Sequence, residues 1–547
     1  MDETNRTDAL ADRYWDELLE LEPTLGTSVG DERYDDRLPD PSEAGRAHAE
    51  AVHRAALAET TAIDREALDA PRRATLDVAE AIARRFLAGL EHRTDRLSVA
   101  NHLWGPGQSL GEIASIQLAD TPERLERYEA RLRAFPAHLE AWAEVGRDGI
   151  AAGVTTPRVV AERSIAQVER LLALPADGSP ALMPVTDDAA RDRITEIVRD
   201  VVNPAYEAFL GVLRDYLPHA TESLGLSSLP GGEAMYAAEV LAWTTLPLDP
   251  REVHELGNAR FDAIMEERHA IGGRLGYASS DQALAAYKAT GADTAESPEA
   301  LVAIVEDQVR RSWDAAAPWF GRLPSANCEV RAVEAFREAD MPMAFYNPPT
   351  EGGSRPGVYY INTYDLPSRE LHSIAGVTFH EANPGHHFQV ALEQEADDLP
   401  RLRRFGGILA GSAFTEGWGL YAERLADEMG LYLDDWQRLG MLENQALRAG
   451  RLITDTGLHA LGWDRERAIA KLQDGGTPRT DAEIEIDRYI AMPAQALSYM
   501  TGMVEIEKAR AAAESREGDA FSLRDFHDRL LAMGTVPLPS LTREFGS

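Results

Sequence analysis

Cysteine is nearly absent from this chain of 547 residues, because Cys328 is the only one. A single cysteine cannot form an intrachain disulfide, and it cannot supply the cysteine sets that hold structural zinc. Any metal that the chain binds must therefore be held by histidine, aspartate or glutamate side chains.

Long apolar runs are also absent. No uninterrupted apolar segment is long enough to span a bilayer, and residues 1–6 are polar, without the apolar core of a signal peptide. From these two absences we expect a cytoplasmic protein, unless a leader peptide has been removed. The negative net charge of the chain also argues against an anionic membrane as a partner.

Positive charge is scarce relative to negative charge. The chain has 55 lysine and arginine residues against 92 aspartate and glutamate residues, which gives a formal net charge of −37. A field of this sign repels polyanions, so we do not expect nucleic acid as a partner. The chain also lacks a G-x-x-x-x-G-K phosphate-binding loop. The sequence leaves the oligomeric state open.

Most segments have the periodicity of amphipathic helices, so the fold class is expected to be mainly α. Asp249 and Ser297 each precede a proline, as a helix N-cap precedes proline at the first helical position. A segment rich in glycine, serine and proline at 226–233 is the best candidate for a boundary. We therefore expect an N-terminal helical lobe at 1–230 and a catalytic lobe at 231–547. Amphipathic helices are predicted at 66–91, 122–145, 157–174 and 187–216, the last with a kink at Pro204.

A short stretch ahead of residue 370 has a different pattern. Alternating residues at 328–333, 343–346 and 357–362 predict a small β-sheet, with a loop at 347–353. An edge strand can pair with the backbone of an extended ligand, so we expect the last strand, with Tyr360, to bind the substrate. A hairpin that only packs against the core is the alternative.

The stretch from His380 to His387 concentrates metal-binding side chains, because it reads His-Glu-Ala-Asn-Pro-Gly-His-His. In H-E-x-x-H metallopeptidases two histidines at i and i+4 hold zinc on one helical face, and the glutamate activates a water molecule. In this chain Pro384 stands where the second histidine would be.

The helix must be distorted if this stretch is to hold a metal. On an unbroken helix His386 would lie about 9 Å along the axis from His380 and about 120° off its face. Pro384 removes a helical hydrogen bond, and Gly385 permits unusual backbone angles. A Pro-Gly bulge that absorbs two residues would bring His386 beside His380. His387 is the alternative ligand.

A third protein ligand completes a catalytic zinc site and leaves a position for water. Glu416 is the first choice, because it follows about one helix-turn-helix downstream, and Glu423, two turns later on the same face, is the alternative. We therefore expect one divalent metal per chain, zinc, held by His380, His386 and Glu416. Glu381 would be the general base that accepts a proton from the attacking water.

Two polar clusters lie in otherwise apolar C-terminal segments. Tyr499, or in second place His459, could donate a hydrogen bond to an oxyanion. Arg488 could bind a substrate carboxylate through a bidentate contact. A hydrogen-bonding network between helices is the alternative role for each of the three.

These motifs together resemble those of a large bacterial family catalogued as domain of unknown function 885. The resemblance covers nearly the whole chain and is carried by the H-E-x-x-P-G-H-H motif at 380–387, the E-G-W-x-L-Y-x-E segment at 416–423, and the segments at 455–459, 488–489 and 496–499. Such proteins look like helical zincins of the thimet-oligopeptidase and carboxypeptidase type. The resemblance implies a two-lobed helical zincin-like fold in which the lobes flank a deep cleft.

The sequence therefore predicts a zinc-dependent hydrolase, in the first place a peptidase that cleaves short peptides in a deep cleft. One alternative is an amidohydrolase that acts on non-peptide amides or amino-acid conjugates at the same metal. Another is a metal-binding or peptide-binding scaffold that has no turnover.

Overall fold

The structure is a computed structural model that describes residues 2–334, 338, 342–351 and 356–546. The fold is mainly helical, as the sequence predicts, and the described residues form one small sheet. Gly352 and Gly353 of the loop expected at 347–353 lie outside the described residues. None of the helices in the described part of the chain is both long and apolar enough to cross a membrane.

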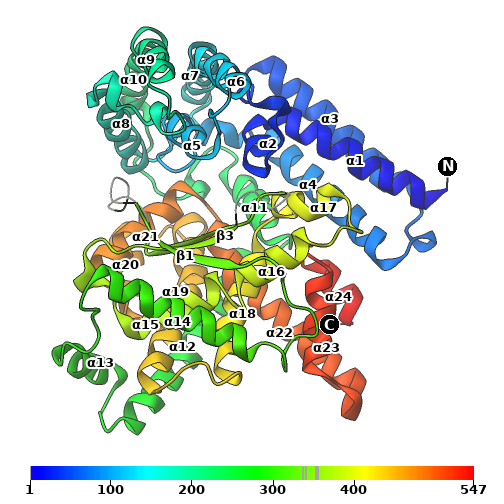
Figure 1. Ribbon diagram of the computed structural model, residues 1–547, viewed down its shortest axis with the longest axis vertical. Helices are drawn as coiled ribbons and strands as arrows, with labels where there is room; N and C mark the ends of the chain where they lie inside the picture. Colours follow the sequence, from blue (N-terminus) through cyan, green and yellow to red (C-terminus); the bar gives the residue numbers. More distant parts are fainter. Residues whose placement is uncertain (1, 335–337, 339–341, 352–355, 547) are drawn as a thin grey trace.

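The helices of the first 220 residues form the upper part of the molecule in Figure 1. A π-helical turn at Val198–Val202 lies between the last two of them, and the backbone stays right-handed helical through it, so the helix expected at 187–216 is continuous from Asp188 to Tyr216. Its irregular turn comes just before Pro204. These helices are α1 (Glu3–Leu21), α2 (Pro23–Val29), α3 (Glu43–Ala62), α4 (Ala70–His92), α5 (Ser109–Ile116), α6 (Pro122–Arg133), α7 (Phe135–Ala152), α8 (Arg158–Ala173), α9 (Asp188–Ile197) and α10 (Asn203–Tyr216).

The remaining helices, with the sheet, form the lower part (Figure 1). Asp249 and Ser297 cap the helices that follow them, as predicted, by accepting hydrogen bonds from backbone N–H groups of the first turn. These helices are α11 (Gly232–Thr244), α12 (Pro250–Arg274), α13 (Ser280–Ala289), α14 (Pro298–Ala315), α15 (Leu371–Glu381), α16 (His386–Gln394), α17 (Arg401–Gly406), α18 (Ala413–Glu428), α19 (Asp435–His459), α20 (Arg465–Asp474), α21 (Arg479–Ala491), α22 (Ser498–Glu517), α23 (Leu523–Ala532) and α24 (Pro539–Phe545).

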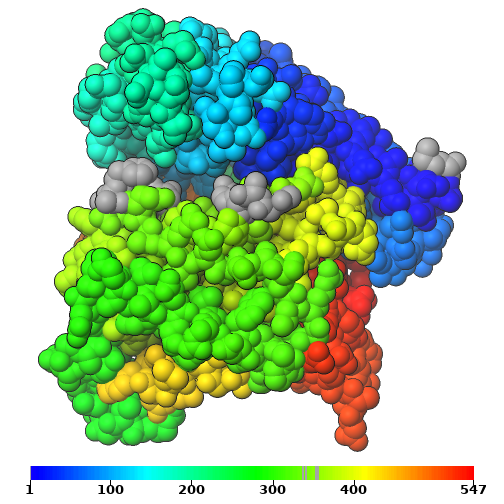
Figure 2. All heavy atoms as spheres, viewed as in Figure 1, coloured from blue at the N-terminus to red at the C-terminus, as the bar shows by residue number. Residues whose placement is uncertain are grey.

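Two large hydrophobic clusters stabilise these parts. One lies within the α5–α10 region, between Val99 and Ala220. The other combines α1, α3 and α4 with the helices after residue 226. In Figure 2 the yellow surface of α17 accordingly lies against the blue N-terminal helices. The lobes expected at 1–230 and 231–547 therefore do not coincide with the two cores.

The small sheet contains β1 (Cys328–Ala332), β2 (Ala344–Asn347) and β3 (Gly357–Ile361) in the order β1-β3-β2. The central strand β3 pairs in parallel with β1 and antiparallel with β2. The backbone pairing with substrate expected for this strand is therefore wrong, because both of its edges are already used. The Tyr360 ring stacks on Phe345 of β2, with the ring centroids 4.9 Å apart.

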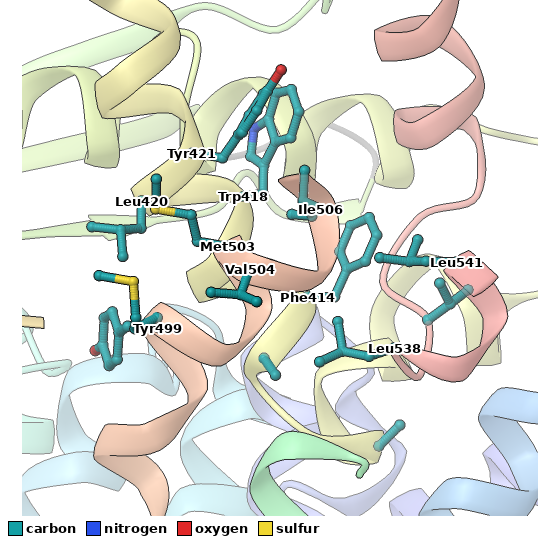
Figure 3. Packing of buried hydrophobic residues seen from close by; sticks show 14 of the residues in the cluster. Phe414, Trp418, Leu420, Tyr421, Tyr499, Met503, Val504, Ile506, Leu538 and Leu541 are labelled. Carbon is teal, nitrogen blue, oxygen red and sulfur yellow. The ribbon is translucent and has the colours of Figure 1, made fainter. Parts of the chain in front are cut away.

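Helices α18 and α22 cross in backbone contact at two glycines. A Cβ atom on Gly417 would lie 2.3 Å from the carbonyl carbon of Gly502, and a Cβ atom on Gly502 would lie 1.8 Å from the carbonyl oxygen of Ala413. Only glycine permits so close an approach. Figure 3 shows apolar side chains around this crossing, with Tyr499 at the opposite end of the group from Leu541.

The start of α15 is anchored by the buried His372. Its Nδ1 atom lies 2.7 Å from Asp293 Oδ2, and its Nε2 atom lies 3.1 Å from Glu443 Oε2. Burial lowers the pKa of His372, but the two carboxylates more than offset this and raise it to about 9. Glu370 is close enough for a metal-binding group with Asp293 and His372. Because both ring nitrogens are bonded to carboxylates, however, the ion cluster is complete without a metal.

Replacing Gly502 by alanine is expected to lower the free energy of unfolding by about 3 kcal/mol or to prevent folding, because the new methyl group overpacks a backbone contact. The control is Gly211→Ala in the exposed part of α10, where no neighbouring atom lies within 4 Å of the added Cβ. This variant should gain up to about 1 kcal/mol. Urea unfolding measures the free energy of unfolding of both variants. Equal changes in the two variants would contradict the close backbone contact between α18 and α22.

Replacing His372 by glutamine should destabilise the protein more at pH 6 than at pH 10. The folded-state pKa is raised, so the stabilisation is fully present below the unfolded value of about 6.5 and is lost as the pH rises through about 9. We expect a loss of about 3 kcal/mol at pH 6 in urea unfolding. The exposed His48 of α3 gives the control His48→Gln. A loss that is independent of pH would show that His372 acts only by packing.

Candidate metal centre

Helices α15 and α16 are separated by a turn at residues 382–385. The Pro-Gly bulge expected within one helix is therefore a complete break between two helices, with a cis peptide bond between Asn383 and Pro384. A Cβ atom on Gly385 would lie 1.9 Å from the carbonyl oxygen of His380. Glycine is thus required here by a close backbone approach, and His386 becomes the first residue of α16.

Trp418 of α18 holds this turn in place. Its indole Nε1–H donates to the carbonyl oxygens of Pro384, at 2.9 Å, and Gly385, at 3.2 Å. The side chain is fully buried. Because these two carbonyls belong to the segment just before His386, Trp418 fixes the position at which α16 begins.

The helix break brings the three expected ligands together. The Nε2 atoms of His380 and His386 lie 3.6 Å and 3.5 Å from Glu416 Oε2. The two imidazole centroids are 4.6 Å apart, with the rings nearly perpendicular. Ligand atoms on a tetrahedral zinc ion are about 3.3 Å apart. The spacing of these atoms is therefore close to that of a zinc ligand set.

Glu381 belongs to the same group. One ligand atom each from His380, Glu381 and His386 lie within 4.8 Å of one another. Burial raises the pKa of the Glu381 carboxyl, and the two imidazoles lower it in part. A carboxyl whose pKa is raised is better suited to exchange a proton near neutral pH than an ordinary glutamate.

Glu423, the alternative third ligand, contacts the opposite side of His380. Its Oε1 atom lies 2.9 Å from His380 Nδ1, and the side chain is fully buried. A carboxylate in this position orients a metal-binding imidazole and fixes its tautomer. Between the two glutamates, Gly419 leaves room for the ring, since a Cβ atom there would lie 2.7 Å from His380 Nε2.

The charges of this group favour a cation. Burial lowers the pKa of His380, but Glu416 and Glu423 outweigh it and raise the pKa to about 9. Burial opposes ionisation of Glu416, yet the two imidazoles hold its pKa well below the usual range. Three carboxylates thus face two imidazoles, and this donor set of nitrogen and oxygen atoms suits zinc or a similar divalent metal.

His387, the alternative second ligand, does not face this group. Its Nε2–H donates to the carbonyl oxygen of Ala326 at 3.0 Å, and its Nδ1 accepts from the Tyr346 hydroxyl at 2.9 Å. Burial lowers the pKa of the imidazole to about 4. Both ring nitrogens are therefore engaged, whereas the Nδ1 atom of His386 has no partner in the described part of the chain.

Tyr499 and Arg488 lie beside the candidate centre. The ring of Tyr499 stacks over that of His380, with the centroids 6.3 Å apart and the planes 25° apart. An Nη2–H group of Arg488 donates to Gln495 Oε1 at 2.7 Å and to the Tyr499 hydroxyl oxygen at 3.4 Å. The structure therefore brings Tyr499 next to His380, and Arg488 next to the Tyr499 hydroxyl.

The expectation for His459 is wrong. The backbone N–H of Leu226 donates to His459 Nδ1 at 3.2 Å, and His459 Nε2–H donates to the carbonyl oxygen of Tyr489 at 3.0 Å. The ring is fully buried and stacks on Tyr236. With both nitrogens bonded to backbone groups, His459 joins three segments of the fold and has no N–H left for an oxyanion.

One segment has the G-x-S-x-G spacing of serine hydrolases, at residues 107–111. In those enzymes the serine stands on a sharp turn between a strand and a helix. Ser109 begins α5, but the described residues before it form turns and no strand. The required strand-to-helix turn is therefore missing.

The roles of Trp418 and Gly419 were not predicted from the sequence. The available signal was a tryptophan with glycine on both sides, within a segment that is otherwise helical. Glycine in a helix weakens it and therefore often marks a close approach. Gly417 faces α22, and Gly419 faces His380.

A cavity of about 560 Å³ is lined by residues of α12, α18, α19 and α22. Its wall contains Tyr421, Met500 and Met503 together with paired arginines and glutamates. The lining does not include His380, His386 or Glu416. This cavity is therefore separate from the candidate metal centre.

Two solved structures are similar to this protein over nearly its whole length. A candidate lipoprotein from Colwellia psychrerythraea is 26% identical, with a TM-score of 0.93 and coverage of 100% of this chain and 99% of that chain. A candidate lipoprotein of unknown function from Shewanella oneidensis is 20% identical, with a TM-score of 0.76 and coverage of 98% and 99%. No curated protein gives a significant match.

These neighbours contradict the cytoplasmic location that we expected. A lipoprotein is attached to a membrane through a lipid, not dissolved in the cytoplasm. The expectation rested partly on the absence of a long apolar segment. A covalent lipid anchor needs no such segment, so its absence does not discriminate between the two locations.

The family resemblance drawn from the motifs is confirmed over most of the chain. The match spans residues 23–545, which include every residue of the candidate metal centre. The chain therefore belongs to the family described as bacterial protein of unknown function, DUF885.

Proposed function

We propose that the protein is a metal-dependent hydrolase, and that it is a zinc peptidase acting on short peptides. The observation that carries the proposal is the meeting of His380, His386 and Glu416 at spacings of 3.5–3.6 Å around one carboxylate oxygen. Two further features support it. Glu423 is bonded to the rear of His380, and Glu381 stands beside the ligand set.

Each group has a distinct role in this proposal. His380, His386 and Glu416 would hold one divalent ion per chain, with Glu423 orienting the first of them. The ion would supply Lewis-acid chemistry, which polarises a carbonyl group and makes water more acidic. The half-buried Glu381 accepts a proton from the attacking water and passes it to the leaving amine nitrogen.

The residues beside the metal centre complete the proposed site. Tyr499, whose ring stacks over His380, donates its hydroxyl hydrogen to the oxyanion of the tetrahedral intermediate. Arg488, next to that hydroxyl, binds an anionic group of the substrate. The two-lobed zincin-like arrangement with a deep cleft belongs to the same proposal, and it would admit short peptides and exclude folded proteins.

The same atoms could hydrolyse a non-peptide amide or an amino-acid conjugate, which is the second candidate function. A scaffold without turnover is less well supported, because it would need no proton acceptor beside its metal. Glu381 occupies that position and has a raised pKa. Cleavage tests should therefore include both short peptides and acyl amino acids.

The purified protein is expected to bind about one equivalent of zinc, measured by elemental analysis after dialysis. Replacing His380 or His386 by alanine should abolish the retained metal, since each removes a ligand. Glu423→Gln should weaken affinity only about 10–100-fold, because it removes an orienting group.

The matched control is His387→Ala, which should keep the metal because both nitrogens of His387 are bonded elsewhere. Loss of metal from this variant, with retention in His386→Ala, would reverse the ligand assignment. Stoichiometric zinc in His380→Ala would place the metal at another site.

Replacing Glu381 by glutamine should lower the turnover of metal-loaded protein about 10²–10⁴-fold, because an amide cannot accept the proton. Metal content and thermal stability should not change. The control is Glu428→Gln on the same helix as Glu416, where the carboxylate pairs with Arg510 at the separate cavity. Turnover unaffected by Glu381→Gln would rule out the proposed base, and no cleavage of any amide by wild-type protein would favour the scaffold.

A further inference from the structure

Three arginines converge on Tyr499. The guanidinium carbons of Arg451 and Arg448 lie 4.3 Å and 6.0 Å from the centroid of its ring. Arg488 Nη2 lies 3.4 Å from its hydroxyl oxygen. Arg448 and Arg451 are one turn apart on α19, and Arg488 comes from α21. Three positive side chains therefore meet beside the aromatic ring that stacks over His380.

The three arginines carry three positive charges but have fewer carboxylate partners than that. Glu485 accepts hydrogen bonds from Arg451, through Nη2 at 2.8 Å and Nε at 3.1 Å, and its other oxygen lies 3.6 Å from Arg488 Nη1. Arg448 has no ion pair among the described residues, and its Nη1–H donates only to the carbonyl oxygen of Asn444, at 3.3 Å. One carboxylate thus faces three guanidinium groups.

Two donors of this group are buried and have no acceptor in the described part of the chain. They are Arg448 Nε and Arg451 Nη1. The Arg451 side chain is only 5% exposed. A buried charged donor without a partner is costly, so such groups are ordinarily paired. These two atoms therefore point to a ligand that supplies the missing acceptors.

The electrostatics of Glu485 show how strong the positive field is. Burial raises the pKa of its carboxyl, but Arg451 and Arg488 outweigh burial and lower the pKa to about 2. The whole chain carries a formal charge of −37. The local excess of positive charge around Tyr499 thus contrasts with the net negative charge of the whole chain.

The arginine group adjoins the candidate metal centre. Tyr499 contacts the arginines and also stacks over His380. An anion bound here would therefore lie close to an amide placed between Glu381 and the histidines.

We propose that Arg448, Arg451 and Arg488 form an anion subsite that binds the terminal carboxylate of the substrate. The inference deepens the proposed function and rests on it for treating the bound molecule as a substrate. Arg448 Nε and Arg451 Nη1 supply the two free donors, and Arg488 closes the subsite next to the Tyr499 hydroxyl. The substrates are short peptides or acyl amino acids with a free carboxylate close to the bond that is cleaved.

Binding of two matched probes tests the subsite without relying on turnover. Benzoylglycine carries a terminal carboxylate, and benzoylglycinamide is its neutral counterpart. Calorimetric titration is done on chelator-treated protein, so that neither hydrolysis nor direct contact of the carboxylate with a metal contributes. We expect the acid to bind at least about tenfold more tightly than the amide, as a charge-assisted contact requires. Equal affinity, or no binding of the acid, would overturn the proposal.

Arg448→Gln should reduce this preference at least about tenfold, because it removes the guanidinium that has no carboxylate partner. The control is Arg438→Gln on the same helix, which changes the charge equally but removes a pair with Asp427, 2.7 Å away. The control should keep the preference of the wild-type protein. A preference that survives Arg448→Gln would exclude Arg448 from the subsite.

The stability of the ligand-free protein gives a second measurement. Arg448→Gln should raise the Tm or leave it unchanged, because it relieves repulsion among the three neighbouring positive charges. A structural arginine would lower the Tm when replaced. A clear drop in Tm together with an unchanged preference for the acid would assign Arg448 to the fold instead of to ligand binding.

A third probe separates a terminal carboxylate from an acidic side chain. Benzoylaspartic acid α-amide carries its only carboxylate on the side chain, and we expect it to bind more weakly than benzoylglycine. Tighter binding of this probe would overturn the terminal assignment. Failure of hydrolysis would count against the proposed function alone, because the preference for the acid is measured in protein that does not turn over.

Discussion

Two imidazoles that stand six residues apart in the sequence must reach the same carboxylate oxygen, and an unbroken helix cannot satisfy this condition. The chain meets it by ending α15 at Glu381 and beginning α16 at His386. The turn between the helices is tight enough to exclude any side chain at Gly385. Its position is fixed from outside, by the indole of Trp418.

Much of the candidate centre depends on α18. Glu416 faces both imidazoles, Trp418 holds the turn, and Glu423 contacts the rear of His380. Gly419 leaves the space that the imidazole fills, and Gly417 lets α22 approach with Tyr499 near its start. The orientation of α18 about its own axis therefore determines the positions of the proposed ligand, of the side chain that holds the turn and of the group that orients His380.

Local chemistry made part of this arrangement predictable. The helix starts at Asp249 and Ser297 follow from capping, and the small sheet follows from alternation. The choice of His386 over His387 came from requiring two nitrogens to meet, which is a geometric condition on the motif itself. Glu416 and Glu423 lie on the same helical face, so the sequence could not show which of the two carboxylates would face the metal-binding nitrogen of His380.

Features that depend on distant partners were not predictable in the same way. Strand order is decided by segments that are far apart in the sequence, so the central position of β3 was missed. His459 was the second choice for a hydrogen-bond donor to an oxyanion, but its partners are the backbones of Leu226 and Tyr489. The three arginines around Tyr499 come from two helices, and only folding brings them together.

The two contacts of His380 with α18 have a consequence for motion. One imidazole is held at Nδ1 by Glu423 and faces Glu416 at Nε2, so a slide of α18 along α15 by one turn, about 5.4 Å, would break both contacts at once. The glycine contact with α22 opposes the same slide. These contacts therefore oppose sliding of the three helices past one another, and a hinge that admits a ligand is expected outside them.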